Sequence, residues 1–258
     1  MLIYKNVNRV TVFLLLVFIL LKVLFSISFL WFLFLVVIWL TLTIIGSFHI
    51  RWNYFLKAKH HNYNINENAI AITFDDGIHS EFTPKVLKLL NQYNAKATFF
   101  LIGKQVEGQQ EILKNIIHQG HTIGNHTYSH SNNLGFLKTN EVLSDLKKTQ
   151  AIVEDLVGLK MNLFRPAFGV TNPRIAKAVQ SLQLTAIGWS IRSLDTTKIS
   201  KEKIFKKITK NINKGDVILL HDTSQKTVEV LEQLLVFLNN GKLKSITIDQ
   251  LHKLKAYA

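Results

Sequence analysis

The hydrophobic pattern divides the chain into an apolar front and an alternating remainder. From Val23 to Phe48 no residue is charged, and Val10 to Leu21 is uncharged as well. A bilayer-spanning helix needs about 20 apolar residues, so the longer stretch suffices by itself. The shorter stretch, ended by Lys22, fits half of a helical hairpin, an interfacial helix or the start of one long tilted helix. We therefore expect a membrane-anchoring segment of one or two helices over residues 1–50.

After a polar stretch at residues 51–67, which predicts a linker, strand-like and helix-like patterns alternate. Strands are expected at Ala69–Phe74, Ala97–Ile102, His121–Gly124, Asn162–Phe164, Leu184–Trp189, Asp216–His221 and Ser245–Ile248. Helices are expected after Thr83-Pro84, Thr139 and Asn172-Pro173, which are start signals, and over Ser200–Ile212 and Val228–Leu238. This alternation predicts one α/β domain over residues 68–258, as a barrel or an open doubly wound sheet.

Composition limits the classes of binding partner and of metal ligand that we expect. The chain is 48% hydrophobic and 19% charged, and its net charge is +14. Residues 51–258 contain 28 basic and 17 acidic residues. This excess of positive charge favours binding to anionic lipid headgroups or to an anionic polymer, and a solvated lysine-rich surface is the alternative. No nucleic-acid-binding motif is present, so we expect no nucleic-acid partner. Because the chain has no cysteine, any metal must be held by histidine and carboxylate.

The flanking cations leave the topology open. Three precede the longer apolar stretch and three follow it, namely Lys5, Arg9 and Lys22, then Arg51, Lys57 and Lys59. Because the two numbers are equal, the positive-inside rule does not predict which side of the membrane the domain faces. No small-x-small cleavage site follows the stretch, so we do not expect a removed signal peptide. A true hairpin would place Met1 on the same side as the domain.

Two adjacent carboxylates, Asp75 and Asp76, end the first expected strand of the domain. Carboxylates beside a core are costly unless a metal, a basic partner or catalytic work stabilises them. An ordinary Asp-Asp-Gly turn is the simpler interpretation of this stretch alone. The polar residues at later strand ends favour carboxylates stabilised by a metal, a basic partner or catalytic work over an ordinary turn.

His126 and His130 follow the third expected strand. Histidines four apart share one face of a helical turn and can bind one metal ion. With Asp76 they make a set of two imidazoles and one carboxylate that leaves positions open for water and substrate. Zinc is the usual occupant of such a hydrolytic site, and iron, cobalt or manganese also fit.

Three further strand ends carry polar residues. Arg165 follows the fourth expected strand, Asp195 lies in the segment after the fifth, and His221 ends the sixth. Each has a structural alternative: a surface salt bridge, a helix cap and a core histidine. In α/β barrels, active sites are built at the carboxyl ends of strands, and polar clusters at five of the seven expected strand ends favour an active site.

Taken in order, these motifs resemble the polysaccharide deacetylases, the NodB-homology carbohydrate esterases. The motifs are Thr-Phe-Asp-Asp-Gly, His-x-x-x-His, an Arg-Pro loop ending in Gly, an Asp-bearing segment and Leu-x-His. The resemblance covers residues 69–258. It implies a distorted seven-stranded (β/α) barrel, preceded here by a transmembrane helix or helical hairpin, and metal-dependent removal of N-acetyl groups from sugar polymers.

The resemblance also implies roles for individual residues. Asp75 would be the general base and His221 the general acid, while Asp76, His126 and His130 would hold the metal. The remaining roles fall to residues around them: Arg165 pairing with Asp75, Asp195 orienting His221, the Phe168 N–H stabilising the oxyanion and Leu219 lining the acetyl pocket.

Three positions depart from the family pattern. The third motif usually has proline at Ala167, and the fourth usually has Asp at Arg192 and Trp at Thr196. The family residues are present at the metal-ligand, base and acid positions, so we expect the departures to change the shape and charge of the substrate groove. Our hypothesis is that Arg192 pairs with Asp195 or reaches an anionic group on the substrate.

These observations predict a membrane-anchored, metal-dependent deacetylase acting on peptidoglycan or a related N-acetylhexosamine polymer. The alternatives are an O-acetyl esterase acting on a glycan and a catalytically silent glycan-binding membrane protein. A glycan substrate together with a membrane span leads us to expect the catalytic domain outside the cytoplasm, facing the periplasm or cell exterior. The sequence does not predict an oligomeric state.

Overall fold

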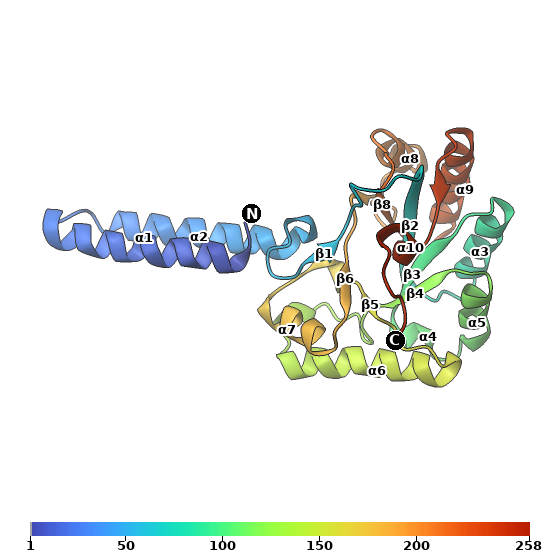
Figure 1. The fold of residues 1–258 in the computed structure, drawn as a ribbon, viewed down its shortest axis with the longest axis horizontal. Coiled ribbons are helices and arrows are strands. Elements are labelled where there is room, and N and C mark those ends of the chain that lie inside the picture. The colour runs from blue at the N-terminus through green and yellow to red at the C-terminus, as the bar shows by residue number, and fades with distance from the viewer. Residues whose placement is uncertain (1) are drawn as a thin grey trace.

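The computed structural model describes residues 2–258, so Met1 lies outside the described residues. Two long helices precede a curled parallel sheet that further helices surround (Figure 1). The strands are β1 (Ala58–Lys59), β2 (Ala69–Gly77), β3 (Ala97–Leu101), β4 (Thr122–Asn125), β5 (Leu163–Phe164), β6 (Thr185–Ile187), β7 (Ile191–Arg192), β8 (Val217–His221) and β9 (Lys244–Ser245). The helices are α1 (Tyr4–Phe25), α2 (Leu30–Phe48), α3 (Phe82–Gln92), α4 (Gly103–Val106), α5 (Gln110–His118), α6 (Thr139–Val157), α7 (Pro173–Ser181), α8 (Lys201–Thr209), α9 (Gln225–Asn240) and α10 (Ile248–His252). Short 3₁₀ turns are η1 (Ile50–Trp52), η2 (Leu134–Phe136) and η3 (Ala167–Gly169).

All ladders of the sheet are parallel, in the order β1-β6-β5-β4-β3-β2-β8-β7, and β9 pairs with the start of β2. Strands β6 and β7 lie near opposite ends of this path, yet only residues 188–190 connect them. The sheet must therefore curl until its two ends nearly meet. This geometry confirms the expected α/β class and distorted barrel.

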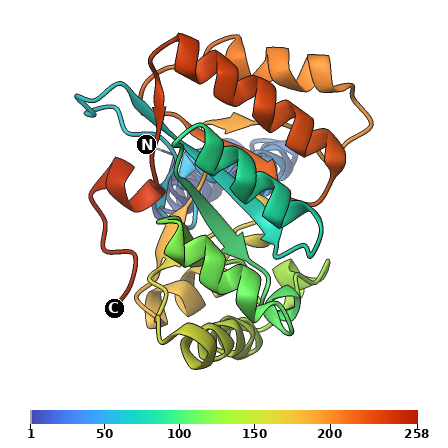
Figure 2. The same cartoon turned by 90° about the vertical axis from the view of Figure 1, so that its right-hand side faces the viewer.

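The strands are buried on both faces, which explains their continuous apolar runs. Every residue from Ala69 to Asp75 is buried, and the outer face packs on helices α3, α5, α8 and α9. Figure 2 looks along the two N-terminal helices and shows the other helices around the sheet. Parallel strands end at one edge of the sheet, and the predicted site residues lie at that edge.

Helices α1 and α2 form an antiparallel hairpin whose far end lies well away from the sheet (Figure 1). The Trp39 indole donates to Asn8 Oδ1 at 2.8 Å, and Phe18 packs edge-on against Phe32. Both helices have a mean hydropathy of 2.3 and leave most of their side chains exposed, so by length and composition each can cross a membrane. Of the sequence alternatives, the hairpin is therefore the arrangement that forms.

Two sequence expectations about local structure were wrong. Residues 51–67 are not a free linker, since β1 adds a strand beside β6 and Tyr54 and Leu56 are buried. The expected strand Ser245–Ile248 ends at Ser245, because Thr247 caps helix α10 in a capping box with Gln250. The division of the chain into domains at these boundaries stays a prediction.

Candidate active site

The carboxylates of Asp75 and Asp76 lie at the carboxyl end of β2, between β3 and β8. Asp75 is 4% exposed, whereas Asp76, with a left-handed φ of 68°, is half-buried. Neighbouring strand residues point to opposite faces, and the left-handed turn at Asp76 brings both carboxylates to one site. The two therefore have different surroundings: Asp75 contacts a cation and Asp76 contacts imidazoles.

Asp76, His126 and His130 form a group whose ligand atoms all lie within 4.8 Å of one another. Oδ1 of Asp76 is 3.5 Å from Nε2 of His126 and 3.2 Å from Nε2 of His130. That oxygen is buried and has no hydrogen-bond partner among residues 2–258. An unpartnered carboxylate oxygen facing two imidazoles is a donor set that fits a divalent cation.

The protonation states favour the same occupant. Burial would raise the pKa of Asp76, but the neighbouring His126 and the charge of His130 lower it to about 2. Burial and the neighbouring His126 lower the pKa of His130. An ionised carboxylate and a neutral imidazole are the forms that bind a metal.

The backbone fixes His126 in the required tautomer. Its Nδ1 lies 2.8 Å from the carbonyl oxygen of Arg165, which can only accept, so Nδ1 carries the proton and Nε2 is left to bind. The segment to His130 is not the expected helical turn, because Thr127 and His130 both have positive φ. The Thr127 hydroxyl accepts from the His130 N–H instead and closes the turn.

Arg165 is fully buried and holds Asp75. Its Nη1 donates to Asp75 Oδ1 at 2.7 Å and to the Thr73 hydroxyl at 2.8 Å. Its remaining donors reach the carbonyls of Ile187 and Gly188 at the junction between β6 and β7. The guanidinium therefore leaves Asp75 with its Oδ2 toward the histidines, 3.7 Å from His126 Nε2.

His221 and Asp195 form the second pair. Oδ1 of Asp195 lies 2.8 Å from Nδ1 of His221, and Oδ2 accepts from the His221 N–H. Burial would lower the pKa of His221, but the hydrogen bond and charge of Asp195 raise it to about 8. Its Nε2 faces Asp76 Oδ2 at 3.9 Å. A histidine protonated near neutral pH can donate a proton into the site.

Phe168 and Leu219 lie at the edges of this cluster. Phe168 has a left-handed φ of 58°, is 47% exposed, and its ring centroid is 4.5 Å from that of His130. Gly169 follows with φ of 70°, and a Cβ there would lie 2.5 Å from the Trp189 ring. Leu219 is buried on β8, two residues before His221.

Arg192 does not pair with Asp195. No ion pair joins the two among residues 2–258, because Asp195 is occupied by His221, Ser193 and Thr227. The exposed Arg192 guanidinium lies instead 5.9 Å from the centroid of the Trp189 ring. The first half of our hypothesis about Arg192 was therefore wrong.

Sequence reasoning missed several supporting residues. Asp145 on α6 accepts from the N–H groups of Tyr128 and Ser129 and so fixes the loop that carries both histidines. Asp222 is fully buried, accepts from the Thr83 hydroxyl, and burial raises its pKa to about 7. No spacing rule links Asp145 to that loop. Asp222, in contrast, directly follows His221 in the sequence, and this position at a strand end could have identified it.

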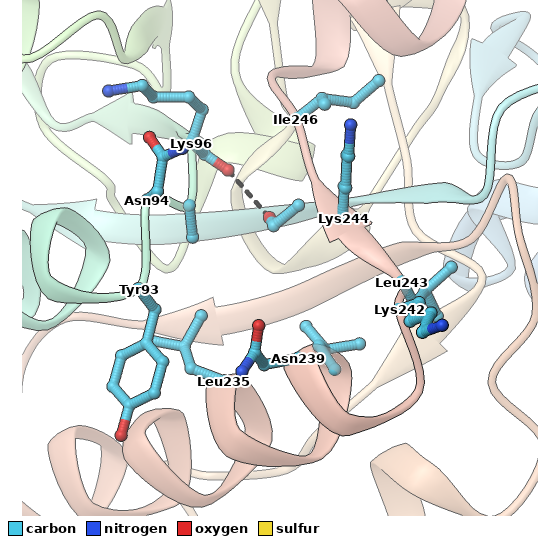
Figure 3. Close-up of a pocket in the computed structure, with 12 residues that line it drawn as sticks. Tyr93, Asn94, Lys96, Leu235, Asn239, Lys242, Leu243, Lys244 and Ile246 are labelled. Atoms are coloured by element: carbon cyan, nitrogen blue, oxygen red, sulfur yellow. Dashed lines mark hydrogen bonds between the residues drawn. The ribbon is translucent and has the colours of Figure 1, made fainter.

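A cavity of about 460 Å³ lies at the opposite end of the sheet (Figure 3). Lys96 precedes β3 and Lys244 begins β9, so this cavity is at the amino ends of the strands. It shares no residue with the carboxylate and histidine cluster and is not part of the candidate site.

Comparison with known proteins points to one family. A family model described as polysaccharide deacetylase matches residues 62–187. A peptidoglycan-N-acetylglucosamine deacetylase of Bacillus cereus (strain ATCC 14579) is 35% identical over 187 residues, which cover 71% of this chain and 68% of that protein. The crystal structure of the Bc1960 peptidoglycan N-acetylglucosamine deacetylase is 33% identical, with a TM-score of 0.73 over 78% of this chain and 94% of that chain. BA3943, a CE4 family pseudoenzyme from Bacillus anthracis, is 26% identical, with a TM-score of 0.66 over 72% and 66%.

Proposed function

The chain belongs to the polysaccharide deacetylase family, and on that premise we propose that it is a metal-dependent hydrolase removing N-acetyl groups from an N-acetylhexosamine-containing glycan. The observation that carries the proposal is the Asp76, His126 and His130 set between two further groups, Asp75 and His221. The relatives' names specify peptidoglycan. The substrate class we propose is therefore peptidoglycan or a related envelope glycan, as polymer or as precursor.

Asp76, His126 and His130 would hold the cation, with zinc the first candidate and cobalt, manganese or iron(II) as alternatives. When bound, the cation supplies Lewis acidity to the acetyl carbonyl and to the attacking water. The unpartnered Asp76 Oδ1 supports this assignment.

Asp75 would act as the general base. Its Oδ1 is held by Arg165, which leaves Oδ2 to take a proton from the attacking water. The water oxygen then bonds to the carbonyl carbon, and the negative charge gathers on the former carbonyl oxygen. The Phe168 N–H is the donor we assign to that oxyanion, and Leu219 is the residue we assign to the acetyl methyl.

His221 would act as the general acid. When the carbon–nitrogen bond breaks, the sugar nitrogen must leave as a neutral amine, since an amide anion is too basic. His221 Nε2 donates the proton and Asp195 stabilises the protonated ring. The products are acetate and a free amino sugar, and no other reactant is consumed.

The hairpin of α1 and α2 would anchor the enzyme in the bilayer. Its two helices expose large apolar side chains along their whole length, including Phe13, Phe25, Trp31 and Phe34. Exposed apolar surface of this extent is rare on soluble monomers and marks a membrane or partner contact. Lipid is therefore the environment we assign to it.

Two alternatives share this fold. The same residues can cleave an acetyl ester, which is an easier substrate than an amide. A catalytically silent protein is represented among the structural relatives by BA3943. Asp75 and His221 are both present and both in contact with the cation-binding group here, which favours an active enzyme.

Acetate release by the full chain in detergent tests the proposal. The protein is stripped of metal, reloaded with zinc or cobalt, and offered N-acetylglucosamine oligomers or acetylated xylan. Metal-dependent acetate from the oligomers that is lost in Asp75→Asn supports an N-deacetylase. Acetate from xylan alone supports the esterase, and tight metal binding without acetate from either substrate contradicts both.

A further inference from the structure

The end of the hairpin nearest the domain is docked against the candidate site. The Thr171 N–H, three residues after Phe168, donates to the carbonyl of Ser47 at 2.9 Å. The Tyr4 N–H donates to the carbonyl of Tyr54 at the same distance. Gly46 packs so closely on the Tyr54 ring that a Cβ would lie 2.4 Å from it. The anchor is therefore joined to the active-site loop by direct contacts.

The same region shares a hydrophobic cluster with the site. Ile50 and Leu56, which follow the hairpin, pack in one buried cluster with Ala167, Trp189 and Leu219. Leu219 is the residue assigned to the acetyl pocket, and Ala167 precedes Phe168. A packed core does not deform continuously, so the site is held at a fixed place relative to the bilayer. No long flexible linker connects the hairpin to the domain within the described chain, so the site would not reach a polymer far from the membrane.

The hairpin also changes the charge count across the membrane. It brings the start of α1 to the same side as the domain, as Figure 1 shows, so its cations add to those after α2. Five cations then lie on the domain side, namely Lys5, Arg9, Arg51, Lys57 and Lys59, and only Lys22 lies near the hairpin tip. By the positive-inside rule the domain side is cytoplasmic.

A basic pocket lies beside the docked end. Its volume is about 420 Å³, and its cationic residues are Arg51, Arg192 and Lys207, with Asp216 as the one acid. The Asp216 carboxylate accepts from the Ser190 hydroxyl and the Asn213 N–H, so it is already engaged. Three cations at the membrane end of the domain suit a phosphate group.

One aromatic ring separates this pocket from the catalytic groups. The Trp189 ring has the Arg165 guanidinium at 5.7 Å and the Arg192 guanidinium at 5.9 Å. Arg165 holds the proposed base and Arg192 lines the basic pocket. The buried Trp189 ring therefore connects the lining of the basic pocket to the residue that holds the proposed base.

We infer that the substrate is an N-acetylated sugar carried on a phosphorylated lipid at the cytoplasmic surface of the membrane. The inference rests on the proposed deacetylase function and names its substrate class. It differs from the expectation of an outward-facing domain, which rested on a glycan substrate and a membrane segment of one or two helices. The docked site, the cations on the domain side and the basic pocket each support it.

Cysteine labelling tests the orientation, because the natural chain has no cysteine and so gives no background. Ser28→Cys lies at the exposed hairpin tip and Asn66→Cys on the exposed surface of the domain. In intact cells, or in spheroplasts where the host has an outer membrane, a membrane-impermeant maleimide should label Ser28→Cys and not Asn66→Cys. Labelling of Asn66→Cys under these conditions would overturn the inference, whatever the enzyme's activity. Labelling after lysis verifies that both cysteines react.

Kinetics in vesicles test the substrate. The full chain is offered a glycolipid in which a phosphodiester joins N-acetylglucosamine to the lipid, a neutral glycolipid with the same tail, and a soluble N-acetylglucosamine pentamer. We expect kcat/KM for the phosphoglycolipid to exceed the other two at least tenfold. In Arg192→Ala the ratio of phosphoglycolipid to pentamer should fall at least tenfold.

Lys244→Ala, at the far cavity in Figure 3, is the matched loss of a cation and should leave the ratio unchanged. Equal kcat/KM on the phosphoglycolipid and the pentamer would overturn the inference and leave the deacetylase standing. Acetate from none of the three substrates would overturn both.

Discussion

Arg165 Nη1 and Asp75 Oδ1 are 2.7 Å apart, and both side chains are almost completely removed from solvent. The guanidinium also contacts the Thr73 hydroxyl, two carbonyls and the rings of Phe100 and Trp189. A buried carboxylate without its partner is costly, so this pair makes the stability of the fold depend on the site.

Arg165→Met should therefore destabilise the protein strongly. Removing one partner of a buried ion pair costs about 3–5 kcal/mol because the other charge stays buried. Denaturant unfolding of the full chain in detergent measures the loss. Arg174→Met, which removes an exposed arginine, should stay within about 0.5 kcal/mol. Equal stability of the two variants would contradict the importance of the pair.

Metal binding should depend on the imidazoles. Chelation should abolish acetate release and added zinc should restore it. His130→Ala should weaken zinc binding at least tenfold, as measured by calorimetry, because it removes one of three donors. His118→Ala removes an exposed histidine remote from the site and should bind zinc as the wild type does. Undiminished affinity in His130→Ala would assign the metal elsewhere.

The pH profile should report on His221. The proposed acid works only when protonated and its pKa is raised to about 8, so kcat/KM should fall as pH rises through about 8. In Asp195→Asn the raising charge is lost, so this alkaline limb should move to lower pH. His221→Ala should lower kcat/KM by about 10² to 10⁴. An alkaline limb that stays in place in Asp195→Asn, as it should in the exposed control Asp155→Asn, would rule out this coupling.

Gly46 should control docking of the hairpin. In Gly46→Ala the new Cβ would meet the Tyr54 ring, so the hairpin should separate from the domain. Limited trypsin digestion in detergent should then cleave after the nearby Lys57 several times faster. Thr41→Ala, on the exposed face of α2, should digest at the wild-type rate. Equal rates in both variants would mean that the helix shifts to accommodate the methyl group.

Strand periodicity and the strand-end rule were sufficient to place the main site residues. Asp75, His126 and Arg165 follow apolar runs, and parallel strands bring such positions to one edge. The roles of these residues remain a proposal, but their proximity is visible in the structure. Local sequence was therefore informative wherever the chemistry lies next to a strand.

The remaining features depend on contacts that sequence spacing does not encode. Asp145 reaches the histidine loop from a helix, and Thr227 reaches Asp195 from another. Strand β1 has only two residues in a polar stretch and forms because β6 offers an unpaired edge. Pairing with Asp195 was one of the two expectations for Arg192, but His221 already occupies that carboxylate.

The contacts that dock the anchor join residues far apart along the chain. Ser47 meets Thr171, and Ala58 pairs with Ala186, each pair more than a hundred residues apart. In the membrane-anchored enzyme proposed above, the hairpin is synthesised before the domain and would reach the bilayer while its partners in the domain are still unmade. The domain would therefore complete its folding against a segment already fixed in the membrane, so insertion would precede assembly of the active site.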